Sequence, residues 1–187
     1  MPSILKVCRV GRCDPSTVRM ISSFSDAGYL NVMSFAVANP VTIDLIDVLD
    51  PVLRDAELEG QARSVGIHYA GPVRLDLTCD PELLHRAFEN ILRNALRHSP
   101  AGSIVTVAVL ARQTVVEVTV SDRGAGVEEA RLATIFQPFV RDADGMGTGL
   151  GLEIAANALR LHGGTIRASN QSGGGLAVTC VLPLVTG

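Results

Sequence analysis

Two asparagines, Asn90 and Asn94, lie four residues apart within a segment whose pattern predicts a helix. At about 3.6 residues per turn they share one helical face, with Arg97 and His98 close to it. Two amide oxygens in this relation can hold a Mg²⁺ ion that also binds phosphate oxygens. The alternative is a helix whose polar residues simply face solvent, since exposed asparagines are common.

A second candidate is Asp122, which follows a predicted strand and precedes Gly124 and Gly126. A carboxylate at the end of a strand can accept a hydrogen bond from the exocyclic amine of adenine. The two glycines would let the backbone turn sharply and approach a base closely. The alternative is an ordinary Asp-Gly turn, a common connection between strands.

Four glycines, Gly145, Gly147, Gly149 and Gly151, occupy alternate positions at the start of a helix predicted from about Leu150. Backbone amides in a glycine-rich bend at a helix N-terminus form an anion site. Because glycines at alternate positions carry a high entropy cost in a plain loop, the pattern favours a phosphate-binding loop.

Hydrophobic periodicity predicts the elements that position these residues. Asp80, Pro81 and Glu82 form a strong helix start, with Asp80 as the cap, and this helix runs to about His98. Helices are also predicted over 42–61 and 150–161, and strands over 65–69, 73–77, 104–110, 115–120, 165–169 and 176–182. This order predicts an α+β fold, a two-layer α/β sandwich with helices on one face of a mixed sheet.

Three segments in a fixed order, residues 89–95, 122–126 and 145–152, resemble the N, G1 and G2 boxes of the GHKL (Bergerat-fold) ATP-binding domains. Over residues 41–187 the chain looks most like the catalytic domains of envelope-sensing histidine kinases of proteobacteria. The resemblance implies ATP and Mg²⁺ as cofactors. It also implies transfer of the γ-phosphate to a histidine on a separate dimerisation domain.

Individual roles follow from the same resemblance. Asn94 corresponds to the main Mg²⁺ ligand and Asn90 to its support, while Glu89 matches the acidic residue that assists proton transfer. Arg97 matches the basic residue that meets the phosphates. His98 stands where an aromatic ring often lies near the nucleotide, or is an exposed residue at the helix end. The implied nucleotide site also includes Asp122, Gly124, Gly126, Arg141, Gly145, Gly147, Thr148, Gly149, Leu150 and Gly151.

The segment 135–141 resembles the F box of the same family, in which Phe136 and Phe139 would anchor a short lid over about 141–146. Leu150 and Leu152 would dock this lid onto the core. Many family members carry Thr after the last glycine turn. This chain has Leu176 and Ala177 there, so we expect a water-mediated contact to adenine to be missing.

Asn90 separates branches of the superfamily. Hydrolytic members and serine kinases of the anti-sigma type carry Glu at this place, which can act as a general base, whereas an amide cannot accept that proton. The residue therefore favours the histidine kinases. Two alternatives stay open: a nucleotide-binding regulatory module without transfer activity, and an anti-sigma-type serine kinase.

The phosphoacceptor histidine is expected to lie outside this chain. None of its four histidines, His68, His85, His98 and His162, has the acidic and Arg-Thr-Pro context of the family's acceptor. We therefore expect a monomer that binds ATP with Mg²⁺ and does not phosphorylate itself. Its partners would be the dimerisation domain of the parent kinase and, through the full-length kinase, a response regulator.

Bulk composition bounds these interpretations. The 187 residues, 47% hydrophobic and 19% charged, fit one domain over 41–187 with an N-terminal extension or remnant over 1–40. A net charge of −3 and the absence of Trp argue against nucleic-acid binding. Lys6 is the only lysine, which excludes a Walker-type P-loop. No apolar run approaches the roughly 20 residues of a membrane span. We expect a cytoplasmic fragment with reduced cysteines and no membrane contact, from a parent anchored in the bacterial inner membrane.

Overall fold

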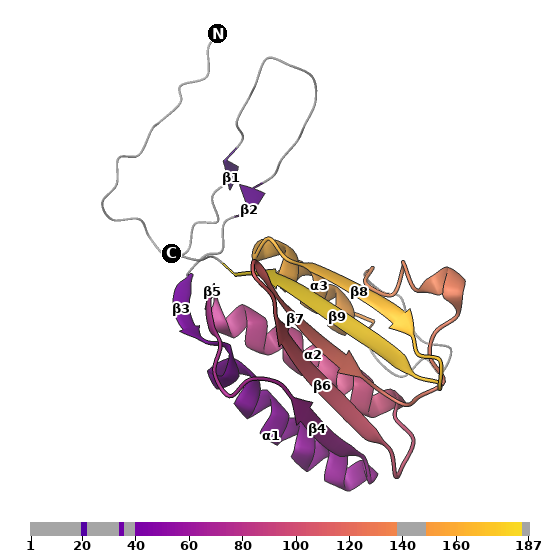
Figure 1. The fold of residues 1–187 in the computed structure, drawn as a ribbon. Helices are drawn as coiled ribbons and strands as arrows, with labels where there is room; N and C mark the ends of the chain where they lie inside the picture. Colours follow the sequence, from indigo (N-terminus) through magenta and orange to yellow (C-terminus); the bar gives the residue numbers. More distant parts are fainter. Residues whose placement is uncertain (1–19, 22–33, 36–39, 138–148, 185–187) are drawn as a thin grey trace.

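The computed structural model describes residues 20–21, 34–35, 40–137 and 149–184. Its centre is a five-stranded sheet in the order β4-β6-β7-β9-β8 (Figure 1). The first pair, β4 with β6, is parallel and the other three pairs are antiparallel, so the sheet is mixed. The strands are β4 Gly66–Ala70, β6 Ile104–Ala111, β7 Val115–Ser121, β8 Thr165–Asn170 and β9 Leu176–Pro183.

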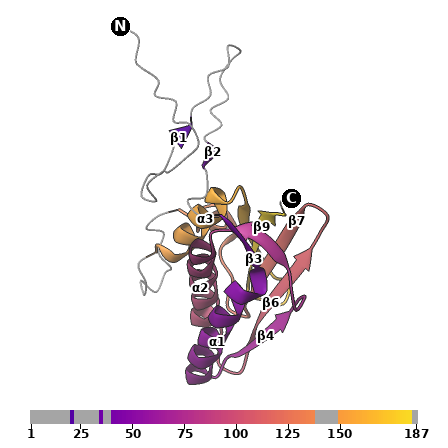
Figure 2. The same ribbon diagram turned by 90° about the vertical axis from the view of Figure 1, so that its left-hand side faces the viewer.

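Three helices, α1 Leu45–Arg63, α2 Pro81–His98 and α3 Gly151–Leu161, cover one face of this sheet (Figure 2). Residues on β6 and β7 alternate between this face and the other, as the period of a strand requires. Val105, Val107 and Val109 of β6 are buried, while Thr106 and Ala108 between them are only half-buried. The predicted two-layer α/β sandwich, with helices on one face of a mixed sheet, is confirmed.

The central helix, α2, contacts both α1 and α3. Its predicted start is confirmed, because Oδ1 of Asp80 accepts hydrogen bonds from the amides of Glu82 and Leu83 at 3.1 and 3.2 Å. Its buried stripe follows helical spacing and faces the sheet and the neighbouring helices. The stripe consists of Leu84, Ala87, Phe88, Ile91, Leu92, Ala95 and Leu96.

Two predicted boundaries were wrong, for one reason. The helix predicted from Thr42 begins at Leu45, because residues 41–44 form strand β3 (Val41–Asp44), which pairs with β5 (Asp76–Cys79). The strand predicted over 73–77 lies at β5 instead, and Val73 is 92% exposed in the preceding turn. Strand pairing over a long sequence separation overrides local periodicity here.

Asp44 ends β3 and caps α1. Its Oδ1 accepts from the amide of Leu75 at 2.9 Å and from that of Ile46 at 3.0 Å. The Leu75 amide first, and the Ile46 amide second, lower the pKa of this carboxyl because both bonds favour the charged form. The cap therefore joins the β3–β5 ribbon to the first turn of α1.

The remaining described elements are short: β1 Met20–Ile21 pairs with β2 Ser34–Phe35, and Glu129–Arg131 forms a 3-10 turn. Cys79 and Cys180 are buried free thiols. Burial raises the pKa of Cys79 to about 11, with a smaller effect of Asp80, and raises that of Cys180 to about 12. None of the helices in the described ranges is long and apolar enough to cross a membrane.

Candidate functional site

The first part of the site is Asp122, which stands at the end of β7 with only 3% of its surface exposed. Its Oδ1 accepts from the amide of Gly124 at 2.8 Å and from the amide of Leu176 at 3.1 Å. The Asp122 amide in turn donates to the Leu176 carbonyl at 3.0 Å. These bonds fix the carboxylate between two strands. Both side-chain bonds formed within the described ranges end on Oδ1, so Oδ2 is the atom left to meet a ligand.

Gly124 brings the Asp122 loop against the end of α2. A Cβ atom on Gly124 would lie 2.4 Å from the carbonyl oxygen of His98, closer than any real contact. The backbone can therefore approach this carbonyl only because the residue is glycine. The close approach observed here is to the protein's own helix, and the predicted approach of these glycines to a base stays a prediction.

The second part of the site is the face of α2 that carries Asn90 and Asn94, both half-buried. The Asn90 side-chain nitrogen donates to the carbonyl of Arg86 at 2.7 Å, which directs its oxygen away from that turn. This oxygen would lie 3.1 Å from a Cβ atom on Gly151, at the first residue of α3. Asn90 thus marks the contact between α2 and the start of α3.

Two segments far apart in the sequence therefore contact α2. Gly151 contacts it at Asn90 and Gly124 contacts it at His98. These two points are separated by eight residues, or about 12 Å of helix. Asn94 lies between them on the same helix. The structure brings the N box together with the G1 box and with the last glycine of the G2 box.

The structure also gives the positions of the remaining predicted site residues that it describes. Glu89 is held in an ion pair with Arg93 one turn along α2. Arg97 and His98 occupy the last turn of α2 and are half-buried. Gly149 has a φ of 69° and is followed by Leu150, which offers no side-chain cap to α3. Phe136 and Leu152, also half-buried, pack against the core. Phe139, Arg141, Gly145, Gly147 and Thr148 lie outside the described residues.

Three further residues were not predicted from the sequence: two hold the loop that follows Asp122, and the third lies at the opposite end of α2. Asn170 bonds both backbone groups of Val127, and Gln171 donates to the carbonyl of Asp122 at 2.7 Å. His162 accepts from the Asp80 amide at Nε2, at 2.9 Å, and its Nδ1 lies 2.7 Å from the Ala158 carbonyl. In the sequence Asn170 and Gln171 stand before a glycine turn, and His162 stands at a helix end. Those positions are the only signals that mark them.

The donor atoms of the site show whether its residues fit a metal ion. No group of three or more His, Cys, Asp or Glu able to hold a metal occurs in the described part of the chain. Amide oxygens such as those of Asn90 and Asn94 are hard ligands of the kind Mg²⁺ accepts. Mg²⁺ commonly binds through one or two protein ligands together with phosphate oxygens and water. The residues therefore fit a magnesium ion that arrives with a nucleotide.

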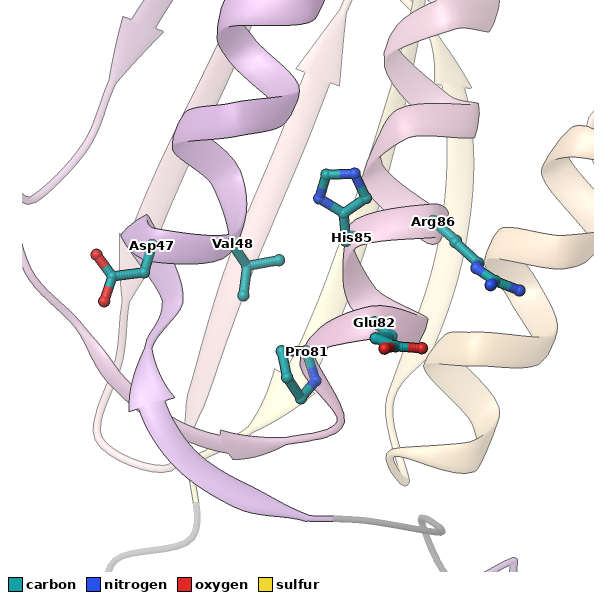
Figure 3. Close-up of a pocket in the computed structure, with 6 residues that line it drawn as sticks. All are labelled: Asp47, Val48, Pro81, Glu82, His85 and Arg86. Atoms are coloured by element: carbon teal, nitrogen blue, oxygen red, sulfur yellow. The ribbon is translucent and has the colours of Figure 1, made fainter. Parts of the chain in front are cut away.

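A separate pocket of about 400 Å³ opens between the first turns of α1 and α2 (Figure 3). Asp47 and Val48 of α1 and Pro81, Glu82, His85 and Arg86 of α2 line it. No predicted site residue lines this pocket. Its two carboxylates stand in the first turns of their helices, where negative charge is favoured by the helix dipole, so their presence needs no ligand.

Comparison with known proteins agrees with this geometry. Residues 79–186 match the family described as histidine kinase-, DNA gyrase B- and HSP90-like ATPases. The chain is 37% identical over 143 residues to the sensor histidine kinase CpxA of Escherichia coli K12, covering 74% of this chain and 30% of CpxA. It thus spans less than a third of the length of that relative.

Solved structures give the same result. The mycobacterial sensor histidine kinase MprB has a TM-score of 0.71 and 26% identity, over 78% of this chain and 98% of that one. The ATP-binding domain of PrrB from Mycobacterium tuberculosis has a TM-score of 0.65 and 26% identity, over 79% and 98%. The resemblance seen in the three boxes is confirmed. The chain therefore belongs to the family of histidine kinase-, DNA gyrase B- and HSP90-like ATPases.

Proposed function

We propose that this chain is the ATP-binding catalytic domain of a sensor histidine kinase. In this role it transfers the γ-phosphoryl group of ATP to a histidine on a separate dimerisation domain. The observation that carries the proposal is the buried Asp122 carboxylate, which two backbone amides hold by one oxygen. Family membership and the contacts of Gly124 and Gly151 with α2 support it.

In the proposed complex, the part of the site that contains Asp122 (the base end) recognises adenine. Oδ1 of Asp122 is engaged by the amides of Gly124 and Leu176, so Oδ2 accepts from the exocyclic amine of the base. Guanine carries a carbonyl oxygen at the corresponding place. That oxygen would face the carboxylate as a second acceptor, which leaves both groups without a donor and costs binding energy. We therefore expect ATP to bind more tightly than GTP.

At the phosphate end, Asn94 with Asn90 would hold Mg²⁺, which neutralises charge on the phosphate oxygens when it is bound. Arg97 and the amides of Gly149, Leu150 and Gly151 at the uncapped start of α3 would meet the phosphates. His98 would lie beside the nucleotide. The lid residues Arg141, Gly145, Gly147 and Thr148 complete the proposed set.

Glu89 would assist removal of the proton from the accepting imidazole. In the structure its carboxylate pairs with Arg93, and both side chains are partly exposed. An exposed pair of this kind is weak, so the carboxylate can leave Arg93 and turn to the acceptor when the dimerisation domain docks.

The remaining functional assignments concern the parent protein. The chain covers 30% of CpxA, so the phosphoacceptor domain and the contact with a response regulator would lie in the rest of the parent. We propose that the parent is anchored in the bacterial inner membrane with this domain on the cytoplasmic side. The isolated chain would bind ATP with Mg²⁺ as a monomer, without phosphorylating itself.

The test is calorimetric titration with a non-hydrolysable ATP analogue, with and without Mg²⁺, on the wild-type chain and on Asp122→Asn. The substitution keeps the Oδ1 acceptor but replaces Oδ2 with an NH₂ donor, which would face the adenine amine. Loss of a hydrogen bond to a charged group costs about 1.5–3 kcal/mol, so affinity should fall roughly 10–150-fold.

Glu117→Gln is the matched control. It neutralises a carboxylate on the same strand β7, but this side chain pairs with Arg112 on the face of the sheet away from the helices. Its affinity should equal that of the wild type. If the wild-type chain fails to bind the analogue, or if Asp122→Asn binds it equally well, the proposal is wrong.

A further inference from the structure

Beyond the side chains assigned to the nucleotide, two neutral amides hold the loop on which Asp122 stands. Asn170 is the last residue of β8 and Gln171 follows it, and their partners lie 43 and 49 residues earlier in the chain. We infer that Asn170 and Gln171 are positioning residues that set the base selectivity of the site. This inference rests on the proposed function, in which Asp122 reads the base.

Asn170 holds the end of the loop. Its Oδ1 accepts from the Val127 amide at 2.9 Å, and its Nδ2 donates to the Val127 carbonyl at 2.6 Å. One side chain therefore satisfies both backbone groups of one residue, as a neighbouring strand would. Such a pair of bonds fixes the position and the orientation of the peptide backbone at once.

Gln171 holds the start of the loop. Its Nε2 donates to the carbonyl of Asp122 at 2.7 Å, and its own amide donates to the carbonyl of Gly175 at 2.9 Å within the β8–β9 turn. The side chain is half-buried. The Gln171 backbone is itself hydrogen-bonded within the β8–β9 turn. Its side chain can therefore hold the Asp122 carbonyl at a fixed position relative to that hairpin.

Together the two amides grip residues 122–127 at both ends. A site discriminates between similar bases only if its polar atoms are held within about 0.5 Å of the right geometry. A loop released at either end could move Oδ2 of Asp122 and the Gly124–Gly126 backbone enough to accept other purines. The loss would therefore appear in selectivity more than in the folding of the domain.

The exposure of the Asn170 side chain distinguishes a role in positioning the loop from a role in stabilising the fold. Asn170 is exposed, although its amide makes two short bonds. An exposed side chain adds little to the buried core that stabilises the domain. Removing it should thus leave the fold intact, while the loop loses its attachment.

The test measures affinities of ATP and GTP analogues by titration for the wild type, Asn170→Ala and Gln171→Met, with Asp122→Asn alongside. We expect the ratio of ATP to GTP affinity to fall about tenfold in Asn170→Ala and in Gln171→Met. The increase in affinity caused by Mg²⁺ should be unchanged, and the melting temperature should fall by no more than about 4 °C.

Two matched controls keep the result specific. Gln61→Met makes the same chemical change at an exposed position of α1, and Ser172→Ala removes a polar group from the exposed turn beyond Gln171. Both should retain wild-type selectivity. If Asn170→Ala does not fold, Gln171→Met decides alone, because its side chain keeps nearly the same size and shape.

The outcomes distinguish this inference from the proposed function. Unchanged selectivity in both Asn170→Ala and Gln171→Met, while the wild type binds and Asp122→Asn binds at least about tenfold more weakly, overturns the inference and leaves the function standing. An equal loss of ATP and GTP affinity together with a large fall in melting temperature also overturns it. Failure of the wild type to bind, or undiminished binding by Asp122→Asn, overturns both.

Discussion

The two ends of the candidate site are built in different ways. At the base end, Asp122 is almost fully buried, and backbone amides and Gln171 bond it from the strands and turn around it. At the phosphate end, Asn90 and Asn94 are half-buried on one helix. Within the described part of the chain, Asn90 bonds only to its own helix and the Asn94 side chain makes no hydrogen bond.

This difference indicates a division of labour. Groups that are already fixed lose little entropy when a ligand binds, so a rigid base end favours affinity and discrimination. Side chains without fixed partners can adapt to a metal ion whose position depends on the phosphates. We therefore expect the base end to be preformed, and the phosphate end to gain its geometry when the nucleotide and Mg²⁺ arrive.

The largest expected effect is a loss of folding stability in Gly175→Ala, which disturbs the packing against Asp122 at the base end. Gly175 has a φ of 105°, and a Cβ atom there would lie 2.1 Å from the carbonyl oxygen of Asp122. Backbone strain and overpacking together should lower the free energy of unfolding by about 2–5 kcal/mol. Thermal or denaturant unfolding measures this loss, and nucleotide affinity should fall with it.

Gly102→Ala is the control for that experiment. Gly102 also has a positive φ, of 81°, but its Cβ would meet nothing within 4 Å. It should cost only about 1–2 kcal/mol from backbone strain and leave nucleotide affinity unchanged. Equal losses in the two variants would show that the backbone at Asp122 can move aside, which contradicts a preformed base end.

The next largest effect should come from Asn94→Ala, which acts at the adaptable end. The increase in ATP affinity produced by Mg²⁺ should fall by at least about tenfold, because the proposed Mg²⁺ ligand is lost. Folding stability should hardly change, since the Asn94 side chain has no hydrogen-bond partner to lose within the described ranges. Titration with and without Mg²⁺, together with thermal unfolding, separates the two quantities.

Asn157→Ala provides the matched control, since among the described residues this asparagine bonds only to Glu153 and Arg160 on its own helix, α3. Its Mg²⁺ dependence should equal that of the wild type. A marked loss of stability in Asn94→Ala would mean that Asn94 is a structural residue, and the contrast between the two ends would disappear.

The smallest effect is expected outside the site, at Asp44→Asn. The Asp44 carboxyl has a lowered pKa because of the amides of Leu75 and Ile46. Its contribution is therefore present above the unfolded pKa and is lost as the pH falls through the folded pKa. The variant should melt no more than about 4 °C below the wild type at pH 7, and the difference should shrink toward pH 3. A difference that grows on acidification, or altered nucleotide affinity, would contradict this.

Local signals made much of this molecule predictable. Asp80 followed by Pro81 gave the start of α2, and alternating apolar residues gave β6 and β7 nearly to the residue. Asp122 and the glycines around it follow a motif whose spacing is short, so the family could be identified from a few residues. These features depend on neighbours within about one turn of helix or one hairpin.

Features that depend on distant partners were missed. The pairing of β3 with β5 joins segments more than 30 residues apart, and periodicity alone had placed Thr42 in a helix. Asn170 and Gln171 bond to residues more than 40 positions earlier in the chain. In the sequence they look like ordinary polar residues of a turn. Their roles become visible only when the sheet brings the two loops together.

The late arrival of those partners has a consequence for biosynthesis. Leu176, whose amide holds the Asp122 carboxylate, is made 54 residues after it. At about 5–20 residues per second, a ribosome needs roughly 3–10 s to add them. Throughout that interval the nascent chain has Asp122 but not the hairpin that orients it. On the proposed function, we therefore expect nucleotide recognition to begin only once Leu176 has been made and β9 has paired with β7, so that a nascent chain ending before Leu176 would not hold ATP at this carboxylate.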